Sequence, residues 1–180
     1  DAKTWAESVT EGSLSWALPT IDELQYIWCA YNGASPVTWE KGANPPCPAK
    51  DEDKWGVFND KLTSPFQKKF YWSSTEAEPL DGKNARWGAT FTIGNTYGGV
   101  ETMESGRYAR AVASFGTAPE PPATAYAVGD LYPNATDAVG IVFVVSNDGT
   151  SGKVLSFEEA TNTAWGVEGL VNASDAEDGA

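Results

Sequence analysis

The sequence predicts an α+β fold, in which an antiparallel sheet is covered by two helices. Short segments that are rich in aromatic and β-branched residues, and bounded by Gly, Pro and Ser, are typical of strands. Three such segments follow one another between residues 63 and 115, and Gly-rich turns join them, which favours antiparallel pairing. A capped segment upstream, with apolar residues at helical spacing, predicts a helix that packs on this sheet.

The N-terminal part is expected to supply the helices. A short helix is predicted over residues 1–9. Thr20 and Glu23 then have the spacing of a capping box, in which each side chain accepts a hydrogen bond from a free backbone N–H of the first turn. Apolar residues recur at helical spacing until the Asn-Gly pair at 32–33, which is a typical helix end. A second short helix is predicted over 51–62.

The strands of the first part are expected at 70–75, 86–93 and 107–112, with a Gly-rich turn region at 94–99. Residues 1–116 thus form one unit. Three prolines in 117–125 predict an extended linker.

Residues 126–180 form a second and smaller unit. A buried strand is predicted at 140–145, a hairpin turn at 147–149 leads into a strand at 152–156, and a short helical piece follows at 157–160. So few weakly apolar residues are not expected to fold alone. We therefore expect this unit to pack on residues 1–116 or on a neighbouring copy.

The composition excludes several classes of function. The formal net charge is −13, which argues against nucleic-acid binding because neutralising phosphates requires clustered Lys and Arg. The sequence contains no run of eighteen apolar residues, so no membrane-spanning helix is predicted. No signal peptide is recognised either, so if the protein is exported, this sequence is expected to be its mature chain. The chain has no His, which removes Ser-His-Asp and Cys-His catalysis and His-ligated zinc.

The two cysteines, Cys29 and Cys47, flank a loop rich in Gly, Pro and Asn. A disulfide between them would stabilise the fold by about 3 kcal/mol through loop closure in the unfolded chain. Two separate thiols, one of them buried on the helix, are the alternative. We favour the disulfide because the chain otherwise has the character of an extracellular protein.

Three segments carry a resemblance to a known family. They are WALPTIDEL at 16–24, YWSSTE at 71–76 and RAV at 110–112. In this order they resemble bacterial surface domains that are related to the C-terminal domain of collagen-like adhesins and to the formylglycine-generating-enzyme-like branch of the C-type lectin fold. The resemblance implies a C-type-lectin-like fold, an extracellular or cell-surface location, and a non-catalytic role in adhesion or assembly.

Residues 126–180 resemble the opening half of the same family, through YAVGDLYP at 126–133, GIVF at 140–143 and GKVLS at 152–156. The two halves therefore stand in permuted order. The chain could be a window cut from tandem repeats, a circular permutant, or a subunit that donates strands to the next copy in a fibre. We favour a complete fold, either within one chain or between adjacent copies.

Two other functions stay open. The first is an enzyme related to the formylglycine-generating group, which would need a reactive cysteine pair or a metal-bound thiolate in a cleft. The second is a calcium-dependent lectin, which needs several carboxylate and carbonyl oxygens around one ion. Only the segment Glu-Pro-Leu-Asp at 78–81 faintly resembles a calcium-lectin loop, and we predict no catalytic residue, metal or cofactor.

Ligand contact is expected in the loops at one end of the sheet, where aromatic faces lie next to amide and charged groups. The candidate ligand-binding residues are Trp87, Asn95, Tyr97, Arg107 and Tyr108. Trp87 and Tyr108 could instead belong to the core, and the adjacent Lys68 and Lys69 are expected to be solvated. The predicted partners are neighbouring copies of the chain, a glycan or a host surface protein.

Overall fold

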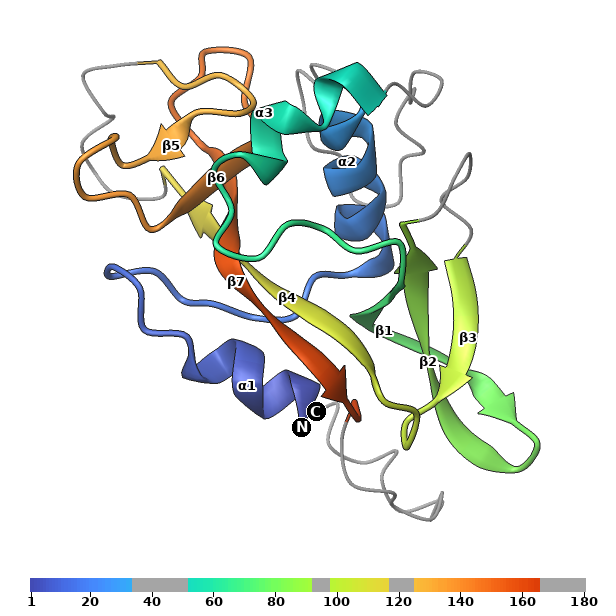
Figure 1. The fold of residues 1–180 in the computed structure, drawn as a ribbon. Coiled ribbons are helices and arrows are strands. Elements are labelled where there is room, and N and C mark those ends of the chain that lie inside the picture. Colours follow the sequence, from blue (N-terminus) through green and yellow to red (C-terminus); the bar gives the residue numbers. More distant parts are fainter. Residues whose placement is uncertain (34–51, 92–97, 117–124, 166–180) are drawn as a thin grey trace.

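The computed structural model describes residues 1–33, 52–91, 98–116 and 125–165, which form an α+β fold around a mixed sheet (Figure 1). The elements are, in chain order, α1 (Ala2–Ser8), α2 (Ile21–Tyr31), the short 3-10 helix η1 (Glu52–Lys54), α3 (Gly56–Asn59), β1 (Phe70–Leu80), β2 (Lys83–Thr90), β3 (Gly98–Thr102), β4 (Arg107–Phe115), β5 (Leu131–Tyr132), β6 (Gly140–Val145) and β7 (Gly152–Thr163). In the described part of the chain, the sheet has seven strands in the order β3-β2-β1-β4-β7-β6-β5.

The sheet is antiparallel except at one place. β1 and β4 run parallel and share the single residue pair Tyr71 and Tyr108, so the prediction of a purely antiparallel sheet is wrong there. That prediction assumed that neighbouring strands are joined by hairpins. β4 instead reaches β1 only after the chain has passed through β2 and β3.

β7 is an inner strand of the sheet, although it belongs to the second unit of the chain. It pairs with β4 along one edge and with β6 along the other, both antiparallel. The helical piece predicted at 157–160 is wrong, because these residues continue β7 and Glu159 and Ala160 pair with β4. Pairing with a neighbouring strand here overrides the local propensity.

Two hydrophobic clusters cover the two faces of the sheet. Successive side chains of a strand point to opposite faces, and accordingly Tyr71 and Leu155 belong to one cluster while Trp72 and Val154 belong to the other. Figure 1 shows α1 beside β4 and β7, with α2 and α3 at the opposite end of the drawing. The first cluster includes residues of α2 and α3, and the second includes residues of α1.

Helix α2 begins where the sequence predicts. The Thr20 backbone N–H donates to Glu23 Oε2 at 2.7 Å and the Glu23 backbone N–H donates to Thr20 Oγ1 at 3.2 Å, which confirms the capping box.

Two other predicted segments differ from the structure or lie partly outside it. The helical region predicted over 51–62 is shorter than expected and consists of η1 and α3. Of the turn region predicted at 94–99, residues 94–97 lie outside the described residues. Gly98 and Gly99 belong to β3.

The three segments that carry the family resemblance meet at the start of α2. Ala17 and Val112 exchange two backbone hydrogen bonds of 3.0 and 2.9 Å. The Ser74 N–H donates to the Pro19 carbonyl at 2.8 Å, and the Ile21 N–H donates to Thr75 Oγ1 at 2.9 Å. These motifs therefore hold the helix start against β1 and β4.

Candidate functional site

The structure brings together two of the five predicted ligand-binding residues. Arg107 and Tyr108 open β4 and line the same pocket. Trp87 lies on β2 with 37% of its surface exposed and does not line that pocket. Asn95 and Tyr97 lie outside the described residues. Tyr108 also packs against the first hydrophobic cluster, with its ring 5.6 Å from that of Tyr71.

The pocket has a volume of about 550 Å³ and is open to solvent. Its walls come from β1, β2, β3, β4 and β7 and the residues beside them, so both units of the chain contribute. The lining residues are Lys68, Lys69, Phe70, Thr90, Glu101, Gly106, Arg107, Tyr108, Thr161 and Asn162.

The pocket lies where β1 and β4 meet through their single pair. The ladder between β4 and β7 is also irregular next to it, between Arg107 and Ala109. Asn162 adopts φ 51°, a left-handed conformation that Asn tolerates better than most residues. Its amide oxygen occupies the space where a side chain at position 106 would begin, so any residue larger than Gly106 would displace the Asn162 side chain.

The charged side chains of the pocket differ in their partners. Arg107 Nη2 lies 2.9 Å from Glu101 Oε1, and the guanidinium carbon lies 5.9 Å from the centroid of the Phe70 ring. The Lys68 ammonium lies 5.7 Å from the centroid of the Trp55 ring. Lys69 is exposed, and its side chain has no ion pair or hydrogen bond among the described residues.

The lining offers three kinds of contact to a ligand. Lys69 and Arg107 can donate charge-assisted hydrogen bonds, whereas the hydroxyls of Thr90 and Thr161 can both donate and accept. Phe70 supplies an aromatic surface, as Tyr108 does with its ring. The aromatic residue Tyr108 and its neighbour Arg107 already indicated this region as a binding site in the sequence. The contributions of β7 were missed, because nothing local indicates that residues 161–162 lie beside β4.

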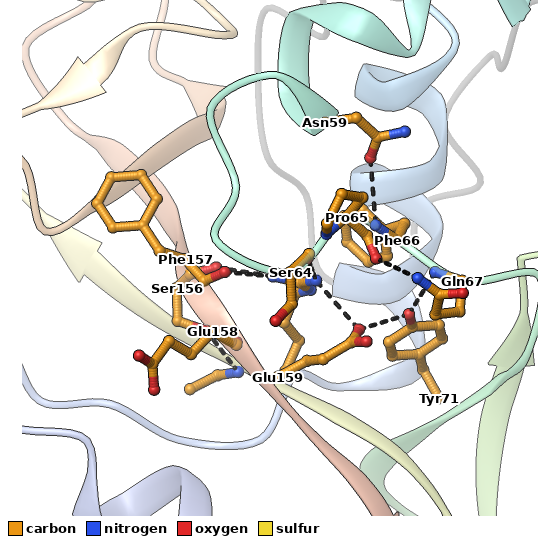
Figure 2. A network of polar contacts seen from close by, with 12 residues as sticks. Asn59, Ser64, Pro65, Phe66, Gln67, Tyr71, Ser156, Phe157, Glu158 and Glu159 are labelled. Carbon is orange, nitrogen blue, oxygen red and sulfur yellow. Dashed lines mark hydrogen bonds and ion pairs between the residues drawn. The ribbon is translucent and has the colours of Figure 1, made fainter.

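A second group of polar residues is buried inside the fold (Figure 2). Arg110 is fully buried, and its Nη2 atom donates to Glu159 Oε2 at 3.0 Å and to the Ser64 carbonyl. Its Nη1 atom donates to the carbonyls of Ser156 and Phe157 at 3.2 and 3.0 Å. The group therefore ties β4 and β7 to the segment that precedes β1.

Tyr71 completes this network. Figure 2 shows Tyr71 and Glu159 directed toward one another, and the phenol O–H donates to Glu159 Oε2 at 2.7 Å. Burial raises the pKa of Tyr71 well above its usual value, and the nearby charge of Glu159 acts in the same direction. Burial also raises the pKa of Glu159, although hydrogen bonds from Tyr71 and Arg110 oppose the change. None of the residues of this network lines the pocket, although Tyr71 packs against Tyr108 of the lining.

Only one of the two cysteines of the predicted disulfide lies among the described residues. Cys29 is completely buried in α2 and is disulfide-bonded. Cys47 lies outside the described residues, so its pairing with Cys29 stays a prediction.

Among the described residues, no three or more Cys, Asp or Glu side chains are grouped so that they could hold a metal ion. Within the same part of the chain, no helix has the length and apolar character needed to cross a membrane.

Comparisons with protein-family models, with curated proteins and with solved structures found no match. The C-type-lectin-like fold therefore stays a prediction that rests on the three sequence motifs.

Proposed function

We propose that this protein is a non-catalytic, exported bacterial surface or fibre module with a C-type-lectin-like fold, and that it acts in adhesion by binding a glycan. The observation that carries the proposal is the pocket of about 550 Å³ that contains Arg107 and Tyr108. A volume of this size is typical of sites for small ligands, which lie roughly between 300 and 1,000 Å³.

The chemistry of the lining suits a sugar. A sugar ring has an apolar face that packs on aromatic side chains and a rim of hydroxyls that exchange hydrogen bonds. Phe70 and Tyr108 provide the aromatic surface, while Thr90, Thr161 and Asn162 provide hydroxyl and amide groups. All of these contacts are available without a metal ion.

The enzyme alternative has less support. A cysteine nucleophile must be accessible as a thiolate. The complete burial of Cys29 and its disulfide bond favour a structural role instead.

The proposal is tested by blocking the pocket. The full chain is applied to an array of neutral and acidic oligosaccharides, and the affinity of any bound sugar is measured in solution. Thr161→Trp should weaken binding at least tenfold, because the indole fills the pocket from an exposed position on β7. Thr136→Trp, at another exposed threonine, is the matched control. A chain that binds no oligosaccharide, or a Thr161→Trp variant that binds normally, would contradict the proposal.

Assembly by exchange of residues 126–165 is a second candidate function. β7 pairs with β4 of the first unit and also supplies Thr161 and Asn162 to the pocket. A copy that received β7 from its neighbour would therefore keep both the sheet and the pocket.

Light scattering over a range of protein concentrations tests this second candidate. Exchange predicts a mass that rises in steps of one chain, and a chain cut after residue 116 should aggregate through the exposed edge of β4. A strict monomer, or a truncated chain that stays folded, would contradict assembly and leave glycan binding in place.

A further inference from the structure

We infer that the pocket selects a saccharide that carries a carboxylate group, such as a uronic acid residue. This inference rests on the proposed function, because it names the class of ligand for the same pocket. The carboxylate would bind Lys69 and Arg107, and the rest of the sugar would contact Phe70 and the polar groups of β7.

The first argument is the local charge. The whole chain carries 12 basic and 25 acidic side chains. Of the ten residues that line the pocket, however, three are basic and only Glu101 is acidic. The lining therefore has the opposite sign to the protein as a whole, and a concave site lined by one sign of charge concentrates ligands of the other sign.

The second argument is that cationic donors in the pocket remain available. Lys69 uses its backbone in two hydrogen bonds, while its ammonium has no partner among the described residues. Arg107 Nη2 pairs with Glu101 Oε1, and Nη1 donates to the Gly106 carbonyl at 3.3 Å. A guanidinium presents five N–H donors, so some of them remain free for a ligand.

The third argument separates a carboxylate from a phosphate. The ion pair between Arg107 and Glu101 is neutral as a unit, and the Lys68 ammonium lies near Trp55. Lys68 and Lys69 then leave two positive charges in the lining, and of these only the Lys69 ammonium has no partner among the described residues, so one carboxylate can pair with it. Glu101 would also repel the second charge of a phosphate group, and it can accept hydrogen bonds from sugar hydroxyls.

The experiment uses three tetrasaccharide probes that differ in the group at C6 of each ring: tetragalacturonate, tetragalactose, and a galactose tetramer sulfated at O6. Their affinities for the full chain are measured by calorimetry at physiological ionic strength. Tetragalacturonate should bind at least tenfold more tightly than tetragalactose. Lys69→Gln should remove most of this preference, because it deletes the cation without touching the backbone bonds of residue 69. Its affinity for tetragalactose should fall by a smaller factor than its affinity for tetragalacturonate.

Lys83→Gln is the control, because Lys83 is also an exposed lysine of the sheet but does not line the pocket. It should bind all probes normally. Equal affinities for tetragalacturonate and tetragalactose would overturn the inference while supporting glycan binding. Equal binding of the sulfated probe would overturn selection for a carboxylate. Binding of an acidic hexapeptide, with no binding of any saccharide, would overturn both this inference and the proposed function.

Discussion

The guanidinium of Arg110 and the carboxylate of Glu159 form a 3.0 Å ion pair in the interior, where their side chains are 0% and 3% exposed. Arg110 belongs to β4 and Glu159 to β7, so the pair joins the two units of the chain. The Phe66 ring lies 4.4 Å from the guanidinium carbon and covers it. The pair thus holds residues 126–165 in their place in the sheet.

Glu159→Gln should therefore destabilise the protein strongly. Glutamine keeps the size of the side chain but leaves the Arg110 charge buried without a counter-ion, which costs about 3–5 kcal/mol. Urea unfolding measures the change through the midpoint at a constant slope. Glu104→Gln is the control, because Glu104 pairs with Lys83 at 2.7 Å on the surface and such pairs contribute about 1 kcal/mol or less. Equal effects of the two variants would show that burial of the pair does not matter.

A double variant separates the ion pair from the packing around it. Arg110→Met combined with Glu159→Leu replaces both charges by apolar groups, so no charge is left unpaired. We expect its loss of stability to be smaller than the sum for the two single variants, by about 1–3 kcal/mol. A double variant whose loss equals that sum would mean that the two residues act independently.

Alkaline pH should destabilise the fold through Tyr71. Its pKa is raised in the folded protein, so the unfolded chain loses this proton near pH 10 while the folded chain keeps it. The folded state then binds more protons, and the free energy of unfolding falls by about 1.4 kcal/mol per pH unit above that pH. Tyr71→Phe has no proton to lose and should show a flatter decline. Parallel curves for the two proteins above pH 10 would contradict this role.

Local interactions explain which parts of the fold the sequence predicts. The α2 helix start depends on Thr20 and Glu23, which lie within one turn of each other, and its position is confirmed. The course of β7 depends instead on β4, since Glu159 pairs with Arg110, far away in the chain. No periodicity within residues 157–160 indicates this partner.

The same distinction holds for the pocket. Arg107 and Tyr108 stand out in the sequence as charged and aromatic residues at the start of a strand. Thr161 and Asn162 become part of the pocket only because Thr163 pairs with Arg107. That pairing follows from the order of the strands in the sheet, and no single segment of the sequence indicates this order.

Gly88→Ala should disrupt the sheet. A Cβ atom at this position would lie well inside 3.0 Å of the Phe70 ring and of the Tyr71 carbonyl oxygen, and the backbone oxygen cannot turn away. Overpacking of this kind costs about 1–3 kcal/mol or more. Gly56→Ala is the matched control, because its Cβ would meet only the movable carboxylate of Asp60, at 3.2 Å. Thermal unfolding compares the two, and a Gly88→Ala protein as stable as Gly56→Ala would contradict the close approach.

The disulfide should join Cys29 to Cys47 within one chain. Peptide mapping without reductant should recover the two cysteine peptides as one linked species, and reduction should separate them. Because the bridge closes a loop in the unfolded chain, Cys47→Ser should lower the free energy of unfolding by about 3 kcal/mol. This variant breaks the bridge from the loop side and leaves the buried Cys29 side chain in α2, whereas Cys29→Ala would add a packing loss. Reductant should lower the stability of the unchanged protein by a similar amount and leave Cys47→Ser unaffected. Linked peptides from two different chains would show instead that the bridge holds copies together.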